Sequence, residues 1–156
     1  MNKTMIGLAL TAAITAFGSA NAQDANPEQS ILVFKTPWCG CCQVWADRMI
    51  EAGYVVETRD MNDLSPIKSQ AGVTEQLSAC HTSVIGDGPA YVLEGHVPIE
   101  AIEMLMSEKP NVRGIAVPGM PRGSLGMGFD ADAQYDVYAF TVGNGENPAV
   151  FLRMGQ

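Results

Sequence analysis

Four cysteines and one histidine are the residues of this chain whose types and spacing point to chemistry. Cys39, Cys41 and Cys42 put three thiols into four residues, and Cys80 lies directly before His81. Close thiolates form sites for soft metals such as Cu(I), zinc or iron–sulfur clusters. One thiolate serves two cuprous ions, and adjacent cysteines suit bridging better than chelation of one tetrahedral ion. We therefore predict a multinuclear Cu(I) site through these five residues, with zinc as the less favoured metal.

The same cysteines also suit redox chemistry. The stretch Trp38-Cys39-Gly40-Cys41-Cys42 resembles the thioredoxin active-site sequence Trp-Cys-Gly-Pro-Cys, with a third cysteine in place of the proline. Backbone N–H groups and the helix dipole at a helix N-terminus favour the Cys39 thiolate, so we expect its pKa to be depressed. Cys42 lies one turn later and is less accessible. Cys39 and Cys42 are the candidate catalytic pair, and a thiol–disulfide oxidoreductase is the alternative function.

Two further interpretations of the cysteines stay open. Four cysteines in an oxidising compartment allow three disulfide pairings. A pairing that joins Cys41 to Cys42 is strained, and a pairing of Cys39 with Cys42 would leave Cys41 to reach Cys80. A structural zinc domain would instead hold one ion firmly and unfold on chelation. Cys80 also fits a small buried apolar residue.

Methionines and a second histidine are further candidate ligands. Thioethers suit Cu(I) in oxidising compartments, since they form no disulfides, and we place Met120 among the metal ligands, ahead of Met127. Methionines also fill gaps in cores. His96, directly before a predicted helix, fits a structural or capping role better than that of a ligand. Trp38 suits either shielding of the thiols or ordinary packing.

The predicted elements place the cysteines where a strand runs into a helix. We predict strands over 31–35, 55–59, 82–85 and 90–94 from their apolar and β-branched runs, and helices over about 39–52, from Ser65 to Gly72, and from Pro98 to Pro110. Helical spacing gives the first helix one buried face: Cys42, Trp45, Ala46, Met49, Ile50 and Gly53.

The C-terminal part is expected to add a loop and a hairpin. Residues 114–129 lack periodicity and should form an irregular loop. Strands over 135–141 and 149–153 should form a hairpin around Gly143-Asn144-Gly145. The resulting order β-α-β-α-β-β-α, within an α/β class, is the thioredoxin-like arrangement with these two segments appended.

The N-terminal residues predict export. Lys3 is followed by an apolar run over 5–17, and Ala20-Asn21-Ala22 fits a signal-peptidase site, so we predict a cleaved signal peptide over 1–22. The apolar run is too short to span a bilayer, which argues against stable membrane insertion. A polar lead-in over 23–30 and a single domain over 31–156 should follow, in an exported protein.

The charge of the chain argues against a nucleic-acid partner. Nine lysines and arginines stand against 17 aspartates and glutamates, for a formal net charge of −8. Phosphate backbones are bound through Lys and Arg, which are in deficit here. Copper ions, and a copper-handling or redox protein of the same compartment, are the partners that we expect.

Four motifs occur in order along the chain, at 34–42, 78–82, 94–98 and 117–121: Phe-Lys-Thr-Pro-Trp-Cys-Gly-Cys-Cys, Ser-Ala-Cys-His-Thr, Glu-Gly-His-Val-Pro and Val-Pro-Gly-Met-Pro. Together they resemble the CopG-like periplasmic copper-resistance family of thioredoxin-like metal-binding proteins, formerly a domain of unknown function. The similarity covers roughly 31–129. It implies a thioredoxin-like fold, export, copper binding through the cysteines, and redox interconversion of Cu(I) and Cu(II).

The position of Cys80-His81 bears on the choice between metal binding and disulfide reduction. In the thioredoxin fold, the residue before the third strand faces the active-site helix and is normally a cis-proline, which positions polypeptide substrates. No proline lies between Pro66 and Pro89 in this chain. A Cys-His pair at this position favours metal binding over general disulfide reduction.

Overall fold

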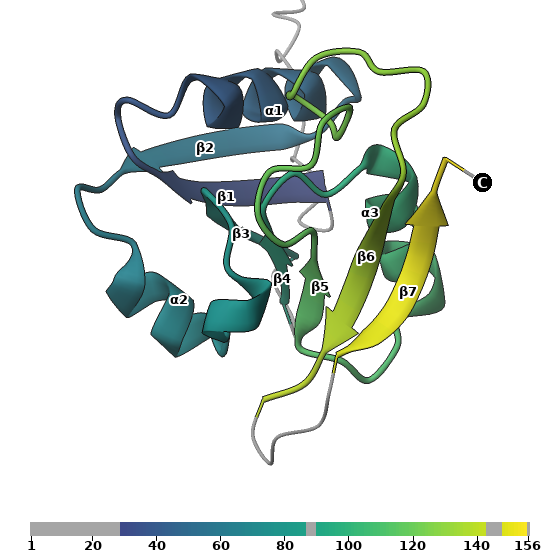
Figure 1. Ribbon diagram of the computed structural model, residues 1–156. Helices are drawn as coiled ribbons and strands as arrows, with labels where there is room; N and C mark the ends of the chain where they lie inside the picture. The colour runs from purple at the N-terminus through teal and green to yellow at the C-terminus, as the bar shows by residue number, and fades with distance from the viewer. Residues whose placement is uncertain (1–28, 87–89, 143–147, 156) are drawn as a thin grey trace, which may run out of the picture.

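One mixed sheet forms the centre of this α/β protein. The computed structural model describes residues 29–86, 90–142 and 148–155. Within these residues, seven strands lie in the order β2-β1-β3-β4-β5-β6-β7, and three α-helices pack against them (Figure 1). The strands are β1 Ser30–Lys35, β2 Val55–Asp60, β3 Thr82–Ile85, β4 Tyr91–Glu94, β5 Gly114–Ala116, β6 Tyr135–Phe140 and β7 Ala149–Met154. The helices are α1 Gly40–Glu51, α2 Ser65–Ala71 and α3 Ile99–Glu108, with a 3₁₀ turn at Glu75–Leu77.

The strand directions follow from the connections between the strands. β1 and β2 are parallel and are joined through α1, and β4 and β5 are parallel and are joined through α3. Parallel neighbours need such crossovers, whereas antiparallel neighbours do not. β3 runs antiparallel to both β1 and β4, and β5, β6 and β7 are antiparallel in succession. The predicted strands and the C-terminal pairing are confirmed, while the hairpin turn 143–147 lies outside the described residues.

Two apolar clusters occupy the two faces of the sheet. Neighbouring residues of one strand point to opposite faces, so Leu93 and Ile115 belong to one cluster while Val92 and Ala116 belong to the other. The larger cluster takes its helical side chains from α1 and α3. The smaller cluster includes Ala71 of α2. Helices α1 and α3 therefore cover one face, and α2 lies on the other.

Helix α1 begins where the sequence predicts it, with Cys39 as its N-cap. Cys42, Trp45, Ala46 and Met49 are buried, as expected from their spacing. The Trp45 indole N–H donates to the carbonyl of Val97 at 2.8 Å, which ties the helix to the segment before α3. The prediction that Ile50 and Gly53 are buried is wrong, because Ile50 is 54% exposed and Gly53 is exposed beyond the end of the helix. Ile50 is one residue beyond Met49 and is rotated by about 100° away from the buried stripe.

Strand β5 corrects the prediction that 114–129 is an irregular loop throughout. Gly114–Ala116 forms a short buried strand between β4 and β6. A Cβ on Gly114 would lie 2.0 Å from the carbonyl oxygen of Val92, so this close pairing requires glycine. Three residues that begin with glycine carry no alternating pattern, which is why the strand escaped prediction. Through β5, the C-terminal hairpin joins the main sheet.

The start of α2 differs slightly from the prediction that Ser65 is its N-cap. Ser65 is already helical and Leu64 occupies the N-cap, while the Ser65 N–H donates to the Asp63 carboxylate at 2.9 Å. Gly72 ends the helix as predicted. Among the residues that the structure describes, no helix combines the length and apolar character that crossing a bilayer requires. The predicted signal peptide lies outside the described residues.

Candidate metal centre

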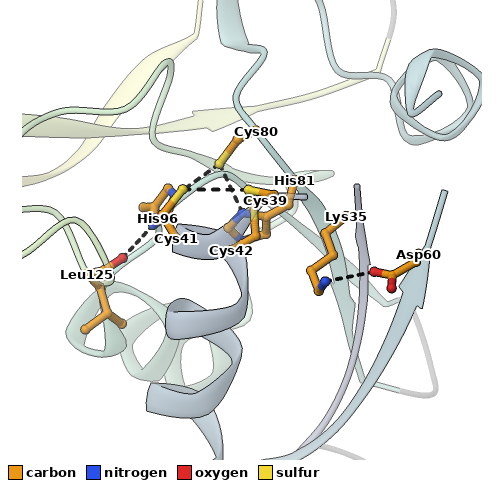
Figure 2. Close-up of a disulfide and its surroundings, with 9 residues drawn as sticks. All are labelled: Lys35, Cys39, Cys41, Cys42, Asp60, Cys80, His81, His96 and Leu125. Carbon is orange, nitrogen blue, oxygen red and sulfur yellow. Dashed lines mark hydrogen bonds and ion pairs between the residues drawn. A yellow bond between two sulfur atoms is a disulfide. The ribbon is translucent and has the colours of Figure 1, made fainter. Parts of the chain in front are cut away.

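The N-terminus of α1 carries three of the thiols. Cys39 is the N-cap and its N–H donates to the carbonyl of Thr36 at 3.1 Å, which turns the chain from β1 into the helix. Cys42 is fully buried, whereas Cys39 and Cys41 are half-buried. Cys39 and Cys42 form a disulfide, with 5.3 Å between their Cα atoms (Figure 2). The Cys41 thiol is free and lies 3.6 Å from the Cys39 sulfur.

The segment before β3 brings the fourth thiol against this helix. Cys80 Sγ lies 3.5 Å from His81 Nδ1 and 3.0 Å from His96 Nε2 (Figure 2). The carbonyl of His81, just before β3, accepts the N–H of Gly95, just after β4, at 2.9 Å. This bond holds the residue before β3 against the residue after β4. Burial, followed by the neighbouring Cys41 thiol, raises the pKa of Cys80 to about 12. A metal ion must therefore displace a proton from Cys80 at neutral pH.

His96 belongs to this group, although the sequence pointed to a structural role. Its Nδ1 lies 2.6 Å from the carbonyl oxygen of Leu125, which only accepts hydrogen bonds, so Nδ1 carries the proton and donates. The unprotonated Nε2 then faces Cys80. Burial lowers the pKa of His96, which favours this neutral form. A histidine that is oriented in this way by a backbone carbonyl has the arrangement common among metal ligands.

His81 is fully buried and has an orphan nitrogen. Its ring lies 4.7 Å from the Trp45 ring and 5.1 Å from the His96 ring, measured between centroids. Burial, followed by the charges of His96 and Lys68, sets the pKa of His81 well below its ordinary value. His81 Nε2 is buried without a hydrogen-bond partner. Buried polar atoms are rarely left in this state, and a neutral imidazole nitrogen is a good donor to a soft metal.

The six side chains form two overlapping groups, each compact enough for a metal ion. Within each group, the candidate ligand atoms all lie within 4.8 Å of one another. One group is Cys39, Cys41, Cys42 and Cys80, and the other is Cys42, Cys80, His81 and His96. The structure thus brings together all five cysteine and histidine candidates and adds His96. Because Cys42 and Cys80 belong to both groups, their sulfurs are placed to bridge two ions.

The other candidates lie at the edge of this cluster or outside it. Met120 is 56% exposed, and the neighbouring Gly119 donates its N–H to the carbonyl of Ser78 at 3.1 Å, close in the chain to Cys80. Met127 is half-buried. Ligation by either methionine stays a prediction. Trp38 is 71% exposed, so ordinary core packing does not account for its position beside the thiols.

Comparison with known proteins supports a metal-related role. A family model described as "Protein of unknown function, DUF411" matches residues 77–127, which include Cys80, His81 and His96. A solved structure titled "Copper resistance protein copG- Form 1" has a TM-score of 0.72 and 35% identity, covering 83% of this chain and 99% of that chain. A second, titled "Form 2", has a TM-score of 0.70 and 36% identity, covering 80% and 96%. A comparison with curated proteins found no match.

Proposed function

Because this chain belongs to the CopG family of copper resistance proteins, we propose that it is an exported protein of copper resistance that binds Cu(I) through clustered cysteines and histidines. The observation that carries this proposal is the pair of overlapping ligand groups that share Cys42 and Cys80. Four thiol sulfurs and two imidazoles form a soft donor set that suits Cu(I). Copper is the cargo or the substrate of the site.

The proposed fold is thioredoxin-like, with β5 and the C-terminal hairpin as an extension. The sheet order β2-β1-β3-β4, with β1 parallel to β2 and β3 antiparallel to its neighbours, supports this assignment. The cysteine motif at the start of the helix after β1 supports it as well. In such a fold, Cys80-His81 takes the place that the cis-proline normally occupies, against the first turn of α1.

We assign copper ligation to Cys39, Cys41, Cys42, Cys80 and His81, and add His96 on the strength of its orientation. One tetrahedral ion needs four ligands, whereas six donors in two groups suit more than one ion with bridging sulfurs. Met120, on the exposed loop after β5, is proposed as a further ligand at the rim. Reduction of the Cys39–Cys42 disulfide would free the two thiolates that the first group requires.

We propose that Cys39 and Cys42 also supply electrons for interconversion of Cu(I) and Cu(II). Two cupric ions would each accept one electron while the Cys39 and Cys42 thiols lose two protons and form one disulfide. The reverse step reduces the disulfide with two electrons from two cuprous ions and takes up two protons. The disulfide in the structure supports a redox-active pair. Export to the periplasm, as the sequence predicts, would place this chemistry with other copper-handling or redox proteins.

An anaerobic titration of Cu(I) into the reduced protein, against a competing chelator, tests copper binding. We expect tight uptake of more than one copper per chain, with thiolate-to-copper absorbance, and we expect Cys39→Ser or Cys42→Ser to abolish the tight binding. The control is Ser107→Ala, at an exposed position near the C-terminal end of α3, and it should match the unmodified protein. Full affinity in the two cysteine variants would overturn the ligand assignment. One firmly bound zinc whose removal unfolds the chain would instead support a structural zinc domain.

A thiol–disulfide oxidoreductase acting on polypeptides is the second candidate. It is favoured by one observation, the Cys39–Cys42 disulfide at a helix N-terminus with Cys39 the more accessible partner. This function needs only these two cysteines. Reduction of insulin by the metal-free protein, unchanged in Cys80→Ala, would support it over the copper site.

A further inference from the structure

A buried ion pair lies beside the segment 79–82, which carries Cys80-His81, and its two residues are outside the proposed ligand set. Glu94, at the end of β4, is fully buried, and the Lys68 side chain on α2 is 15% exposed. Lys68 Nζ donates to Glu94 Oε1. The pair connects α2, on one face of the sheet, to the strand that leads into His96.

The Glu94 carboxylate also accepts two hydrogen bonds from the segment that carries Cys80-His81. Its Oε1 accepts the backbone N–H of Ala79 at 2.7 Å, and its Oε2 accepts the Thr82 hydroxyl at 2.6 Å. Lys68 Nζ also donates to Thr82 Oγ1 at 3.2 Å. Ala79 and Thr82 are the residues on either side of Cys80-His81. One carboxylate is therefore hydrogen-bonded to the residue before this dipeptide and to the residue after it.

Three of the six proposed cysteine and histidine ligands therefore depend on this pair. Cys80 and His81 lie between the two residues that bond to Glu94, and His96 follows Glu94 by two residues. Thr82 and Glu94 are also direct partners in the β3–β4 register. A small displacement of the carboxylate would change the distance between the Cys80 sulfur and the His96 ring, which is now 3.0 Å from Sγ to Nε2.

A charged pair is a costly way to join a helix to a strand inside a protein. Burial raises the pKa of Glu94, and the Lys68 ammonium opposes that rise. Apolar residues of similar volume often replace a buried ion pair without loss of stability, so packing alone does not require one here.

We propose that Glu94 and Lys68 are positioning residues of the copper site. Glu94 holds Cys80-His81 in ligating geometry through Ala79 and Thr82, and Lys68 holds the Glu94 carboxylate and the Thr82 hydroxyl in place through its own hydrogen bonds. This inference rests on the proposed function, because it assigns these two residues a role at the same site.

The decisive measurement is the Cu(I) affinity of reduced variants, by anaerobic competition with a chelator. We expect Lys68→Met to bind Cu(I) at least about tenfold more weakly, as outer partners of metal ligands typically show, and Lys68→Arg to stay within about threefold of the unmodified protein. Lys35→Met is the matched control, because Lys35 is also buried and pairs with a carboxylate, that of Asp60, at 2.8 Å (Figure 2). It should stay within about threefold.

Two outcomes of this measurement would overturn the proposal. One is an affinity of Lys68→Met within about threefold of the unmodified protein, because outer partners that matter cost more than that. The other is equal weakening in Lys68→Met and Lys35→Met, which would show a general effect of losing a buried lysine.

Hydrogen exchange of the metal-free protein provides an independent test. In Glu94→Leu, the Ala79 amide loses its acceptor and should exchange at least about tenfold faster, since local opening no longer breaks that bond. The Met61 amide, bonded to the carbonyl of Lys35 at 2.8 Å, should keep its rate and show that the fold persists. An unchanged Ala79 rate would contradict the positioning role. If the unmodified protein takes up no Cu(I), the proposed function fails, while the Ala79 rate still decides whether the pair positions the segment.

Discussion

At the scale of single residues, two neutral buried histidines distinguish this centre from a plain cysteine cluster. His96 is oriented by the carbonyl of Leu125, and His81 has a buried nitrogen without a partner. Both lie against Cys80, whose thiol is protonated at neutral pH. The site therefore combines imidazoles that are ready to bind with a thiol that must first lose a proton.

Replacing His96 should weaken copper binding without unfolding the chain. In His96→Gln, the amide lacks the ring nitrogen that faces Cys80, and we expect Cu(I) affinity to fall by about 10- to 100-fold. Competition with a chelator measures this loss, and circular dichroism checks the fold. An affinity equal to that of the unmodified protein would remove His96 from the ligand set.

Copper uptake should be strongly dependent on pH. Because the pKa of Cys80 is raised to about 12, its thiol stays protonated across neutral pH and copper must displace that proton. The Cu(I) affinity should therefore rise about tenfold per pH unit for this one proton between pH 7 and 9. Cys80→Ala should flatten the slope by that amount. Identical slopes for the two proteins would show that Cys80 keeps its proton or does not bind.

His81 should make the metal-free protein sensitive to acid. Its pKa in the folded state lies well below the ordinary value of 6.5, so the unfolded chain takes up a proton first as the pH falls. Stability due to neutral His81 is therefore present above pH 6.5 and is lost below it, at about 1.4 kcal/mol per pH unit. Urea unfolding at pH 6.5 and 5.5 measures the loss. His81→Phe should lose less stability over this interval, and equal losses would contradict the assignment.

At the scale of elements, the loop after β5 completes the centre by lying on the first turn of α1. A Cβ at Gly126 would lie 3.0 Å from the Cys41 carbonyl oxygen, 3.1 Å from the Trp45 nitrogen and 3.2 Å from His96 Nδ1. The preceding Leu125 supplies the carbonyl that orients His96. The backbone of the loop therefore packs against the proposed copper ligands Cys41 and His96.

Two glycines of this loop allow backbone strain to be separated from contact with the site. Gly126 and Gly128 have φ values of +90° and +89°, but a Cβ at Gly128 would meet nothing within 4 Å. Both Gly126→Ala and Gly128→Ala should lose about 1–2 kcal/mol of unfolding free energy through the left-handed backbone. Only Gly126→Ala should also weaken Cu(I) binding, because it pushes the loop away from His96. Equal copper affinity in the two variants would contradict this role of the loop.

At the scale of the whole molecule, the core is built without the metal centre. The larger apolar cluster combines α1 and α3 with side chains from β1, β3, β4, β5 and β6, so it spans most of the sheet. Copper would add stability by mass action, but we expect the fold to form without it.

Removing metal should therefore leave a folded protein. We expect the reduced, chelator-treated chain to keep its circular dichroism and to unfold in urea in one cooperative transition, as small single domains usually do. Loss of secondary structure on chelation would instead favour the structural zinc domain. Comparing unfolding with and without Cu(I) should show a higher midpoint for the loaded protein.

Local patterns predicted most of this fold, and the exceptions depended on distant contacts. The strand before the cysteines and the helix after them follow from apolar spacing. The grouping of Cys80 with the α1 thiols follows from the order of the predicted elements along the chain. Strand β5 could not be predicted, because its pairing depends on the absence of a side chain opposite Val92. The role of His96 depends on a carbonyl 29 residues away, and only its place in the 94–98 motif drew attention to it.

The contrast between the two tryptophans makes the centre optically visible. Trp45 is fully buried with its ring against His81, whereas Trp38 is 71% exposed. Fluorescence from Trp45 should be emitted at shorter wavelength and be quenched as copper fills the neighbouring site, while Trp38 contributes a red-shifted background. A Trp38→Phe protein would then report site occupancy through a single native tryptophan, without a label or a competing chelator.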